Sequence, residues 1–233
     1  MPETTLQTTI DTDLVTPLGA YLRLRDGTGG SFLLESVERG RLGRYSLVGR
    51  GSRLVTFDEA EELYASDAGG EPVVGYLGYD AVARLEPTVP LPEQGPGFPE
   101  SLFVVPELLV RFDHARGIAD VVAGDAEELE ELLEAPLPAL PRGEGRSGPL
   151  ERVPDHEEHE RRIRVVQDYI AAGDAFQVVV AQRATRPTSA SAVEIYRALR
   201  RVNPSPYLFL LELGDLALVG SSPETVVKCE DGR

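Results

Sequence analysis

The sequence contains very little cysteine and lysine. Among its 233 residues there is one cysteine, Cys229, and one lysine, Lys228. A single thiol excludes an internal disulfide framework and a cysteine-based zinc cluster, so we expect Cys229 to be a small buried hydrophobic residue on a strand. The formal net charge is −16 and arginine carries nearly all of the positive charge, so nothing in the composition favours binding to nucleic acid.

Long hydrophobic runs are also absent. The longest, such as 178–181 and 208–211, fall far short of the ~18 residues that a membrane span requires, so we expect buried strands and no membrane partner. Residues 1–5 show no basic segment leading into an apolar core, which predicts a cytoplasmic protein without a secretory signal. The hydrophobic content of 42% is sufficient for a sizeable core.

Turn residues divide the first half of the chain into short predicted strands. Alternating apolar residues between glycine and aspartate clusters predict strands at 21–25, 31–37, 45–49 and 53–57, and a hairpin of 108–112 with 118–122. The five prolines from Pro87 to Pro99, both included, exclude regular structure there. An acidic start and leucines on one face predict a helix over 125–134.

A change in composition marks a connection at residues 135–154, where proline, glycine, arginine and glutamate replace apolar periodicity. Beyond it we expect a helix that begins with an N-cap at Asp155 and stops at Gly173. A strand over 176–185, a helix over 191–202 and a hairpin of 207–213 with 216–220 should follow. Strands and helices do not alternate as regular parallel units, which favours a mixed α+β class.

The end of the chain carries a further signal. An alternating run at 225–230 followed by Asp231 and Gly232 predicts a strand entering a two-residue hairpin, yet no return strand follows. Because an unpaired strand leaves a row of unsatisfied backbone groups, we expect a longer protein that is truncated here at its C-terminus.

Four segments, in this order, carry a family resemblance: 33–36 (LLES), 168–183 (DYIAAGDAFQVVVAQR), 203–208 (NPSPYL) and 220–224 (GSSPE). Together they resemble the large subunit of anthranilate synthase, component I, a family of chorismate-utilising enzymes. The resemblance implies two large antiparallel β-sheets packed as a sandwich with helices outside. It also divides the chain into a tryptophan-regulatory region (1–134), a linker (135–154) and the start of the chorismate-binding catalytic domain (155–233).

The resemblance implies a lyase of tryptophan biosynthesis. Chorismate and ammonia would give anthranilate and pyruvate, with ammonia supplied from glutamine by an amidotransferase partner subunit and with L-tryptophan as a feedback inhibitor. Mg²⁺ would bind the substrate, through ligands expected beyond Arg233. No metal ligand is therefore expected in this chain, and the chain alone is expected to be inactive.

The first matched segment resembles the family's tryptophan-inhibition element. Glu35 and Ser36 would supply polar contacts to the amino acid, and Pro206, Tyr207 and Leu208 would form the other wall of its pocket. The tetrapeptide by itself favours a different interpretation, in which its leucines belong to the core and Glu35 is a solvated surface residue.

Two residues are catalytic candidates. Gln177 stands where the relatives that add water to chorismate carry a lysine as general base, and a neutral glutamine suits ammonia, which is already a nucleophile. Glu224 matches the general acid that protonates the departing 4-hydroxyl of chorismate as the nucleophile adds at C2, a role that requires a raised pKa. Structural alternatives are a polar residue on the outer face of a strand for Gln177 and a helix or turn cap for Glu224.

Two other functions stay open. Aminodeoxychorismate synthase component I has a similar sequence, and it commonly carries a lysine in a catalytic segment beyond this chain. A tryptophan-binding module without catalysis of its own belongs to a different class.

Overall fold

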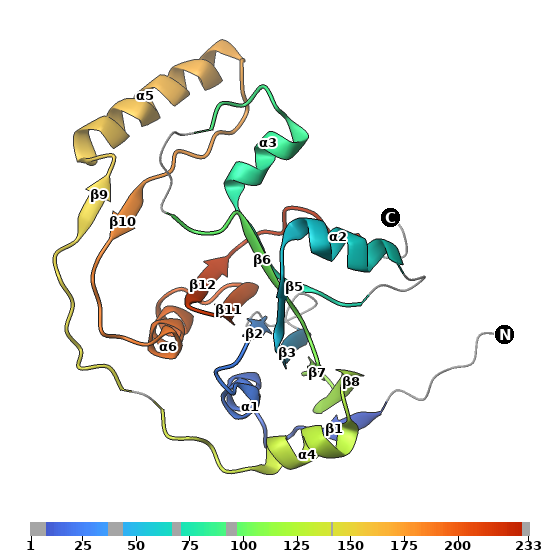
Figure 1. The fold of residues 1–233 in the computed structure, drawn as a ribbon. Coiled ribbons are helices and arrows are strands. Elements are labelled where there is room, and N and C mark those ends of the chain that lie inside the picture. The colour runs from blue at the N-terminus through green and yellow to red at the C-terminus, as the bar shows by residue number, and fades with distance from the viewer. Residues whose placement is uncertain (1–7, 37–43, 67–70, 92–96, 141, 230–233) are drawn as a thin grey trace. The chain divides into compact units, whose positions relative to one another are not determined.

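The structure, a computed structural model, describes residues 8–36, 44–66, 71–91, 97–140 and 142–229. The chain forms two compact units, one of Met1–Leu140 together with Ala192–Arg233 and one of Pro141–Ser191. The structure contains both helices and antiparallel sheets, without regular alternation of strand and helix along the chain, which confirms the α+β class (Figure 1). The functional division at 135–154 stays a prediction. None of the described helices is both long enough and apolar enough to cross a bilayer.

A seven-stranded antiparallel sheet forms the centre of the larger unit, with the spatial order β1-β8-β7-β3-β2-β11-β12. Its strands are β1 (Thr9–Asp11), β2 (Gly30–Glu35), β3 (Tyr45–Gly51), β7 (Leu108–Asp113), β8 (Ile118–Ala123), β11 (Tyr207–Leu213) and β12 (Leu216–Ser222). Two hairpins predicted from turn chemistry, β7 with β8 and β11 with β12, are confirmed. The sheet therefore joins strands from the two ends of the sequence, because β2 pairs with β11.

The two faces of this sheet are covered differently. Helices α1 (Pro17–Leu24), α4 (Ala126–Glu134) and α6 (Ala192–Val202) share one hydrophobic core with the strand residues Leu33, Val48 and Leu210. On the other face, Phe32 and Leu211 pack against a three-stranded sheet of β4 (Arg53–Val55), β6 (Ser101–Val105) and β5 (Val74–Leu77). The expected sandwich thus consists of a large sheet and a small one within the described residues, completed by α2 (Phe57–Ser66), η2 (Tyr79–Ala81) and α3 (Val82–Leu85).

The predicted strand at 21–25 is wrong, because these residues belong to helix α1 and its C-terminal end. The side chain of Thr16 accepts a hydrogen bond of 3.0 Å from the backbone N–H of Gly19, and Pro17 stands at the first helical position. A threonine cap followed by proline is a helix-start signal. The buried ring of Tyr21 then packs into the core from a helix instead of a strand.

The predicted strand at 53–57 is too long. Strand β4 ends at Val55, and a reciprocal cap then begins α2: the backbone N–H of Thr56 donates to Glu59 Oε2 at 2.7 Å, and the N–H of Glu59 donates to Thr56 Oγ1 at 3.4 Å. This capping box starts a helix at Phe57.

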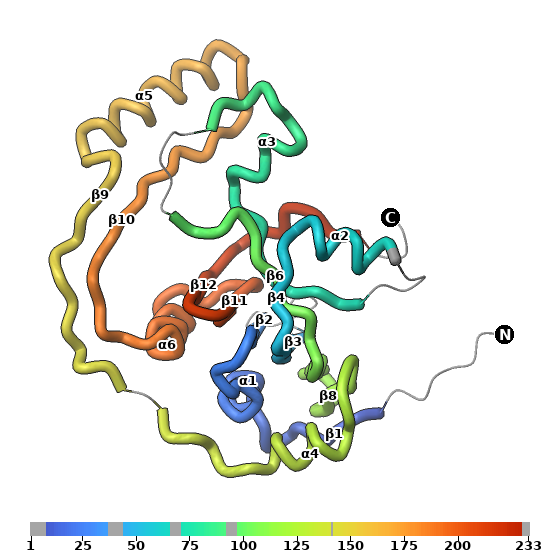
Figure 2. Tube along the Cα trace, in the orientation of Figure 1, coloured from blue at the N-terminus to red at the C-terminus, as the bar shows by residue number. Residues whose placement is uncertain are grey.

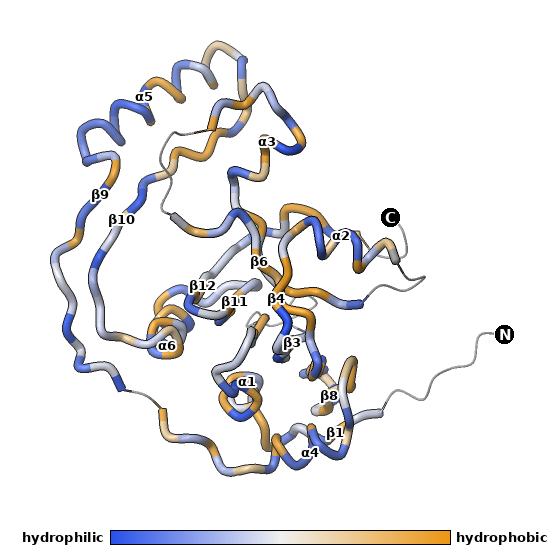
Figure 3. The backbone as a smooth tube through the Cα atoms, viewed as in Figure 1, coloured by the Kyte–Doolittle hydropathy of each residue, from blue (hydrophilic) through white to orange (hydrophobic). Residues whose placement is uncertain are grey.

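The smaller unit is built around one long helix, α5 (His156–Ala172), between the short strands β9 (Glu151–Val153) and β10 (Arg183–Thr185). The predicted caps are confirmed: the Asp155 side chain accepts from the N–H of Glu158 at 2.9 Å, and Gly173 ends the helix with φ at 86°. The two segments that flank α5 run side by side through the β9–β10 pairing (Figure 2). Figure 3 shows hydrophilic residues over the first turns of α5 and mixed colours further on.

The predicted strand at 176–185 is correct only in its last three residues, which form β10. Phe176 is 99% exposed and Val179 is 84% exposed, so the run at 178–181 is not the buried strand that was expected. A strand exists through its ladder of hydrogen bonds, and among the described residues only β9 pairs with this segment.

Residues 225–229 do not form the predicted strand either, and Cys229 is exposed instead of buried. No strand of the described part of the chain pairs with them, which leaves their backbone without a ladder. Residue 230 and the predicted turn at Asp231 and Gly232 lie outside the described residues.

Candidate functional site

Three expected site segments meet at one end of three neighbouring strands. Leu208 on β11 pairs with Glu35 on β2 and, on its other side, with Ser221 on β12. Directly opposed residues point to the same face of a sheet, and Leu208 faces the core beneath the helices. Segments 33–36, 203–208 and 220–224, far apart in the sequence, therefore form one continuous row across the sheet.

The carboxylate of Glu35 is buried at this row, and only 4% of the residue is exposed. Its Oε2 accepts a hydrogen bond of 2.6 Å from Tyr196 Oη, and its Oε1 accepts one of 2.8 Å from Arg200 Nη2. A buried carboxylate is costly unless it is paired and hydrogen-bonded, and here both oxygens have partners. The interpretation of Glu35 as a solvated surface residue is wrong. We refer to Glu35, Tyr196 and Arg200 as the Glu35 cluster.

Helix α6 supplies both partners of Glu35 through its residue spacing. Val193, Tyr196 and Arg200 follow the i, i+3, i+7 pattern of one helical face, and the first two are buried. Tyr196 and Arg200 were not predicted as site residues from the sequence. Their position on the apolar face of the helix was the available signal, but their partner lies more than 160 residues away in the chain.

The environment of Tyr196 favours its neutral form. Burial raises the pKa of the phenol, and the negative charge of Glu35, with the hydrogen bond to it, raises the pKa further. The positive charge of Arg200 opposes this shift only in part. Tyr196 therefore stays a hydrogen-bond donor to Glu35 over the whole neutral pH range.

Ser221 joins β12 to the connection between α6 and β11. Its hydroxyl donates to the backbone carbonyl of Asn203 at 2.7 Å and lies 2.9 Å from the hydroxyl of Ser205, which is buried. The backbone N–H of Asn203 in turn donates to the Leu199 carbonyl at 2.8 Å, so Asn203 continues the last turn of α6. The end of β12 is thus tied directly to the end of α6.

Glu224 follows β12 by two residues, and its side chain is exposed. The Ser222 hydroxyl donates to the backbone carbonyl of Glu224 at 3.0 Å and lies 3.5 Å from its backbone nitrogen. These contacts fix the backbone of Glu224 and leave its carboxyl group free to face a ligand. Within the described residues no helix follows Glu224, so a helix-capping role has no helix to act on.

The remaining candidates lie as follows. Tyr207 is 37% exposed, and Pro206 and Ser36 are half-buried. All three lie next to Leu208 and Glu35, the buried residues of the row, and are more exposed than these two. Gln177 belongs to the smaller unit, where it is exposed on the irregular segment after α5. Gln177 is not on a strand, so the alternative interpretation, a polar residue on the outer face of a strand, is wrong.

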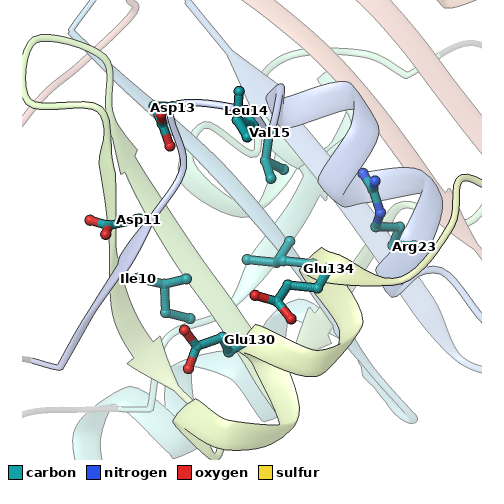
Figure 4. Close-up of a pocket in the computed structure, with 9 residues that line it drawn as sticks. Ile10, Asp11, Asp13, Leu14, Val15, Arg23, Glu130 and Glu134 are labelled. Carbon is teal, nitrogen blue, oxygen red and sulfur yellow. The ribbon is translucent and has the colours of Figure 1, made fainter.

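A separate cavity of about 430 Å³ opens between β1, α1 and α4 (Figure 4). Carboxylates line it together with apolar residues: Ile10, Asp11, Asp13, Leu14, Val15, Glu130, Leu133 and Glu134. Arg23 also lines it, but its guanidinium donates to the backbone carbonyls of Ala135 at 2.6 Å and Gly19 at 3.2 Å. None of the site residues predicted from the sequence lines this cavity.

The described residues bring together no group of three or more histidine, cysteine, aspartate or glutamate side chains that could hold a metal ion.

The chain is similar to known sequences over almost its whole length. The family described as chorismate binding enzyme matches residues 35–233. The chain is 39% identical to "Anthranilate synthase component 1" of Thermus thermophilus, covering 95% of this chain and 56% of that protein. It is 36% identical to the protein of the same name from Pseudomonas aeruginosa, with 94% and 56% covered, and 34% identical to "Probable anthranilate synthase component 1" of Schizosaccharomyces pombe, with 96% and 54% covered. The chain thus spans about half the length of these relatives.

Solved structures show the same fold. Anthranilate synthase component I from Streptococcus pneumoniae aligns with a TM-score of 0.63 at 24% identity, over 96% of this chain and 59% of that one. The menaquinone-specific isochorismate synthase MenF from Escherichia coli aligns with a TM-score of 0.58 at 20% identity, over 93% and 50%. At these identities the structural likeness supports the architecture alone.

We expect the stability of the chain to depend on Tyr196 at alkaline pH. Because the pKa of Tyr196 is higher in the folded protein than its usual value of about 10, its contribution to stability is fully present below about pH 10 and is lost as the pH rises through the folded pKa. Urea unfolding from about pH 8 to 11 should show a steeper loss of stability in the wild type than in Tyr196→Phe. Tyr64→Phe, at a side chain that is 74% exposed, is the matched control and should keep the wild-type slope. Equal slopes for Tyr196→Phe and the wild type would contradict the burial of this pair.

Proposed function

The chain belongs to the chorismate binding enzymes, and we propose that the full-length protein containing it is an anthranilate synthase component I, which converts chorismate and ammonia to anthranilate and pyruvate. One observation carries the proposal: relatives that are 34–39% identical over 94–96% of this chain bear that name or its probable form. The amidotransferase partner that supplies ammonia, the magnesium cofactor and the cytoplasmic location are further parts of the proposal.

Gln177 supports amination over hydration. Water must lose a proton to become a good nucleophile, and a lysine can act as the base for that step. Ammonia already has a free electron pair and needs orientation, which a neutral amide can provide by hydrogen bonding. Glutamine at 177 is therefore consistent with ammonia as the nucleophile, and its exposed position leaves the amide accessible to a ligand.

Glu224 is the proposed general acid. As the bond from nitrogen to C2 of chorismate forms, the bond from C4 to its hydroxyl breaks, and the hydroxyl leaves as water after taking the proton of Glu224. Loss of pyruvate then gives the aromatic product. The contacts of Ser222 with the Glu224 backbone support this role, because they hold the main chain while the carboxyl group stays free.

The row formed by Glu35 and Leu208 is the proposed core of a tryptophan effector site. Glu35 can accept from the ammonium group of an amino acid through lone pairs that Tyr196 and Arg200 leave free. Leu208, which pairs with Glu35 on the same face of the sheet, would supply the apolar wall, and Ser36, Pro206 and Tyr207 are more exposed residues next to this pair in the sequence. This arrangement combines the acceptor and the apolar wall that an aromatic amino acid requires.

We expect the full-length protein to form anthranilate when chorismate, ammonia and Mg²⁺ are supplied, and the 233-residue chain alone to form none at a comparable rate. In the full-length protein, Glu224→Gln keeps the size of the side chain but loses its transferable proton, so turnover should fall by roughly 10²–10⁴-fold. The apparent affinity for chorismate should change little, since the lost interaction belongs to the transition state. Anthranilate fluorescence measures the rate.

The nature of the product decides between the alternatives. Aminodeoxychorismate instead of anthranilate would assign the protein to the neighbouring enzyme class, and tryptophan binding without turnover of the full-length protein would indicate a binding module. A stable Glu224→Gln variant with near-normal turnover would remove Glu224 from the role of acid.

We expect Ser36→Phe to relieve inhibition by tryptophan in the full-length protein and to leave turnover without tryptophan nearly unchanged. A bulky ring beside Glu35 fills the effector pocket but does not enter the chorismate site. Inhibition curves measured for the wild type, for Ser36→Phe and for a control, Ser52→Phe at an exposed turn, provide the test. An inhibition constant unchanged by Ser36→Phe would separate segment 33–36 from the effector site.

A further inference from the structure

Three groups of hydrogen bonds, joined by the backbone of α6 and by the peptide bond between Ser221 and Ser222, connect the proposed effector residue to the proposed acid. Glu35 is bonded to Tyr196 and Arg200 on α6, and the first residue after α6 is bonded to Ser221. Ser221 is followed by Ser222, whose hydroxyl donates to the Glu224 backbone. All of these residues belong to the larger unit, so their contacts are fixed within one packed body.

The connection between α6 and β11 is suited to transmit movement. Asn203 is hydrogen-bonded to Leu199 in the last turn of α6, so its carbonyl moves with the helix end. Pro204 and Pro206 restrict the backbone on both sides of the buried Ser205. A displacement of the last turn of α6 therefore reaches the hydroxyl of Ser221 without being absorbed by a flexible loop.

Strand β12 is held to the end of α6 close to the residues that lead to Glu224. It is the last strand of the seven-stranded sheet, and β11 is its only strand neighbour among the described residues. Beside Ser221, a Cβ atom on Gly220 would lie 2.0 Å from Phe209 Cζ, so glycine allows β12 to approach the Phe209 ring closely. Beyond this contact, the hydrogen bonds of Ser221 tie the end of β12 to α6 and set the position of the residues that follow.

An effector bound at Glu35 would change the hydrogen bonds of Glu35 to Tyr196 and Arg200, the first of the three groups of hydrogen bonds. An ammonium group bound to the free lone pairs of this carboxylate places a second positive charge beside the Arg200 guanidinium and weakens the bond of Arg200 to Glu35. Arg200 lies in the last turn of α6, two residues before its end, so any change in its bond to Glu35 acts on the turn that carries Asn203. The two proposed sites are thereby connected through a single helix end.

We propose that Ser221 is a positioning residue that couples the binding of an effector at the Glu35 cluster to the position of Glu224. The proposal rests on the proposed function, because it assigns the regulation of that enzyme to a specific hydroxyl. The hydrogen bonds of Ser221 to Asn203 and Ser205 transmit the movement of α6 to β12. By thermodynamic linkage, chorismate should weaken tryptophan binding by the same factor as tryptophan weakens chorismate binding.

The test compares binding with inhibition in the full-length protein. For Ser221→Ala, calorimetry should give a tryptophan dissociation constant for the free enzyme within about twofold of the wild type. The factor by which saturating tryptophan lowers the affinity for chorismate should fall by at least about fivefold, the lower limit of common allosteric coupling. Ser221→Thr keeps the hydroxyl and should restore the coupling. Ser31→Ala, a buried serine at the far end of β2, is the control and should keep wild-type coupling.

The outcomes separate this proposal from the proposed function. Coupling in Ser221→Ala equal to that of the wild type, even with a lower melting temperature, overturns the role of Ser221 and leaves the enzyme assignment intact. A wild-type protein that binds no tryptophan overturns the effector site and the coupling together. If Ser221→Ala does not fold, Ser205→Ala removes one of the two bonds from the other side and should weaken the coupling in the same direction; unchanged coupling in that variant also overturns the proposal.

Discussion

The burial of the Glu35 carboxylate is the constraint on which this end of the molecule depends. A carboxylate removed from water is stable only when charged and polar partners replace its hydration. In this protein the partners come from α6, which must therefore dock with Tyr196 and Arg200 directly over the end of β2. Since β2 pairs with β11, the same interaction fixes where the chain re-enters the sheet after α6.

This docking explains why three distant segments converge. The large sheet accepts β11 and β12 from the C-terminal part of the chain beside β2 from the N-terminal part. Glu35, Leu208 and Ser221 then form one row, with a polar residue at each end and a buried leucine between them. The proposed effector residues and the proposed catalytic segment are neighbours in this row although they lie far apart in the sequence.

Local signals in the sequence were sufficient for some of the fold. The hairpin turns between β7 and β8 and between β11 and β12, and the capping aspartate of α5, act within a few residues and were predicted correctly. The error at α1 came from reading a short apolar run as a strand although Thr16 and Pro17 signalled a helix start. The strand predicted over 176–185 failed at 176–182, because pairing depends on a partner that the local pattern cannot supply.

The candidate site was predictable only in part. Motif resemblance supplied Glu35 and Leu208 as neighbours of one pocket, and their pairing is present in the sheet. Tyr196 and Arg200 were not found, because a residue that neutralises a buried charge is identified by its partner in space and not by its sequence neighbours. The roles of Gln177 and Glu224 depend on a bound substrate, and both side chains are exposed in the described structure.

A double-mutant cycle tests the central interaction most directly. The free energy of unfolding should be measured for the wild type, Glu35→Gln, Arg200→Met and the double variant under the same conditions. If the buried carboxylate holds α6 through Arg200, the two substitutions should be non-additive by about 0.5–3 kcal/mol, because the second one removes a partner already lost. Effects that add to within about 0.5 kcal/mol would contradict the account, since the two side chains would then be energetically independent.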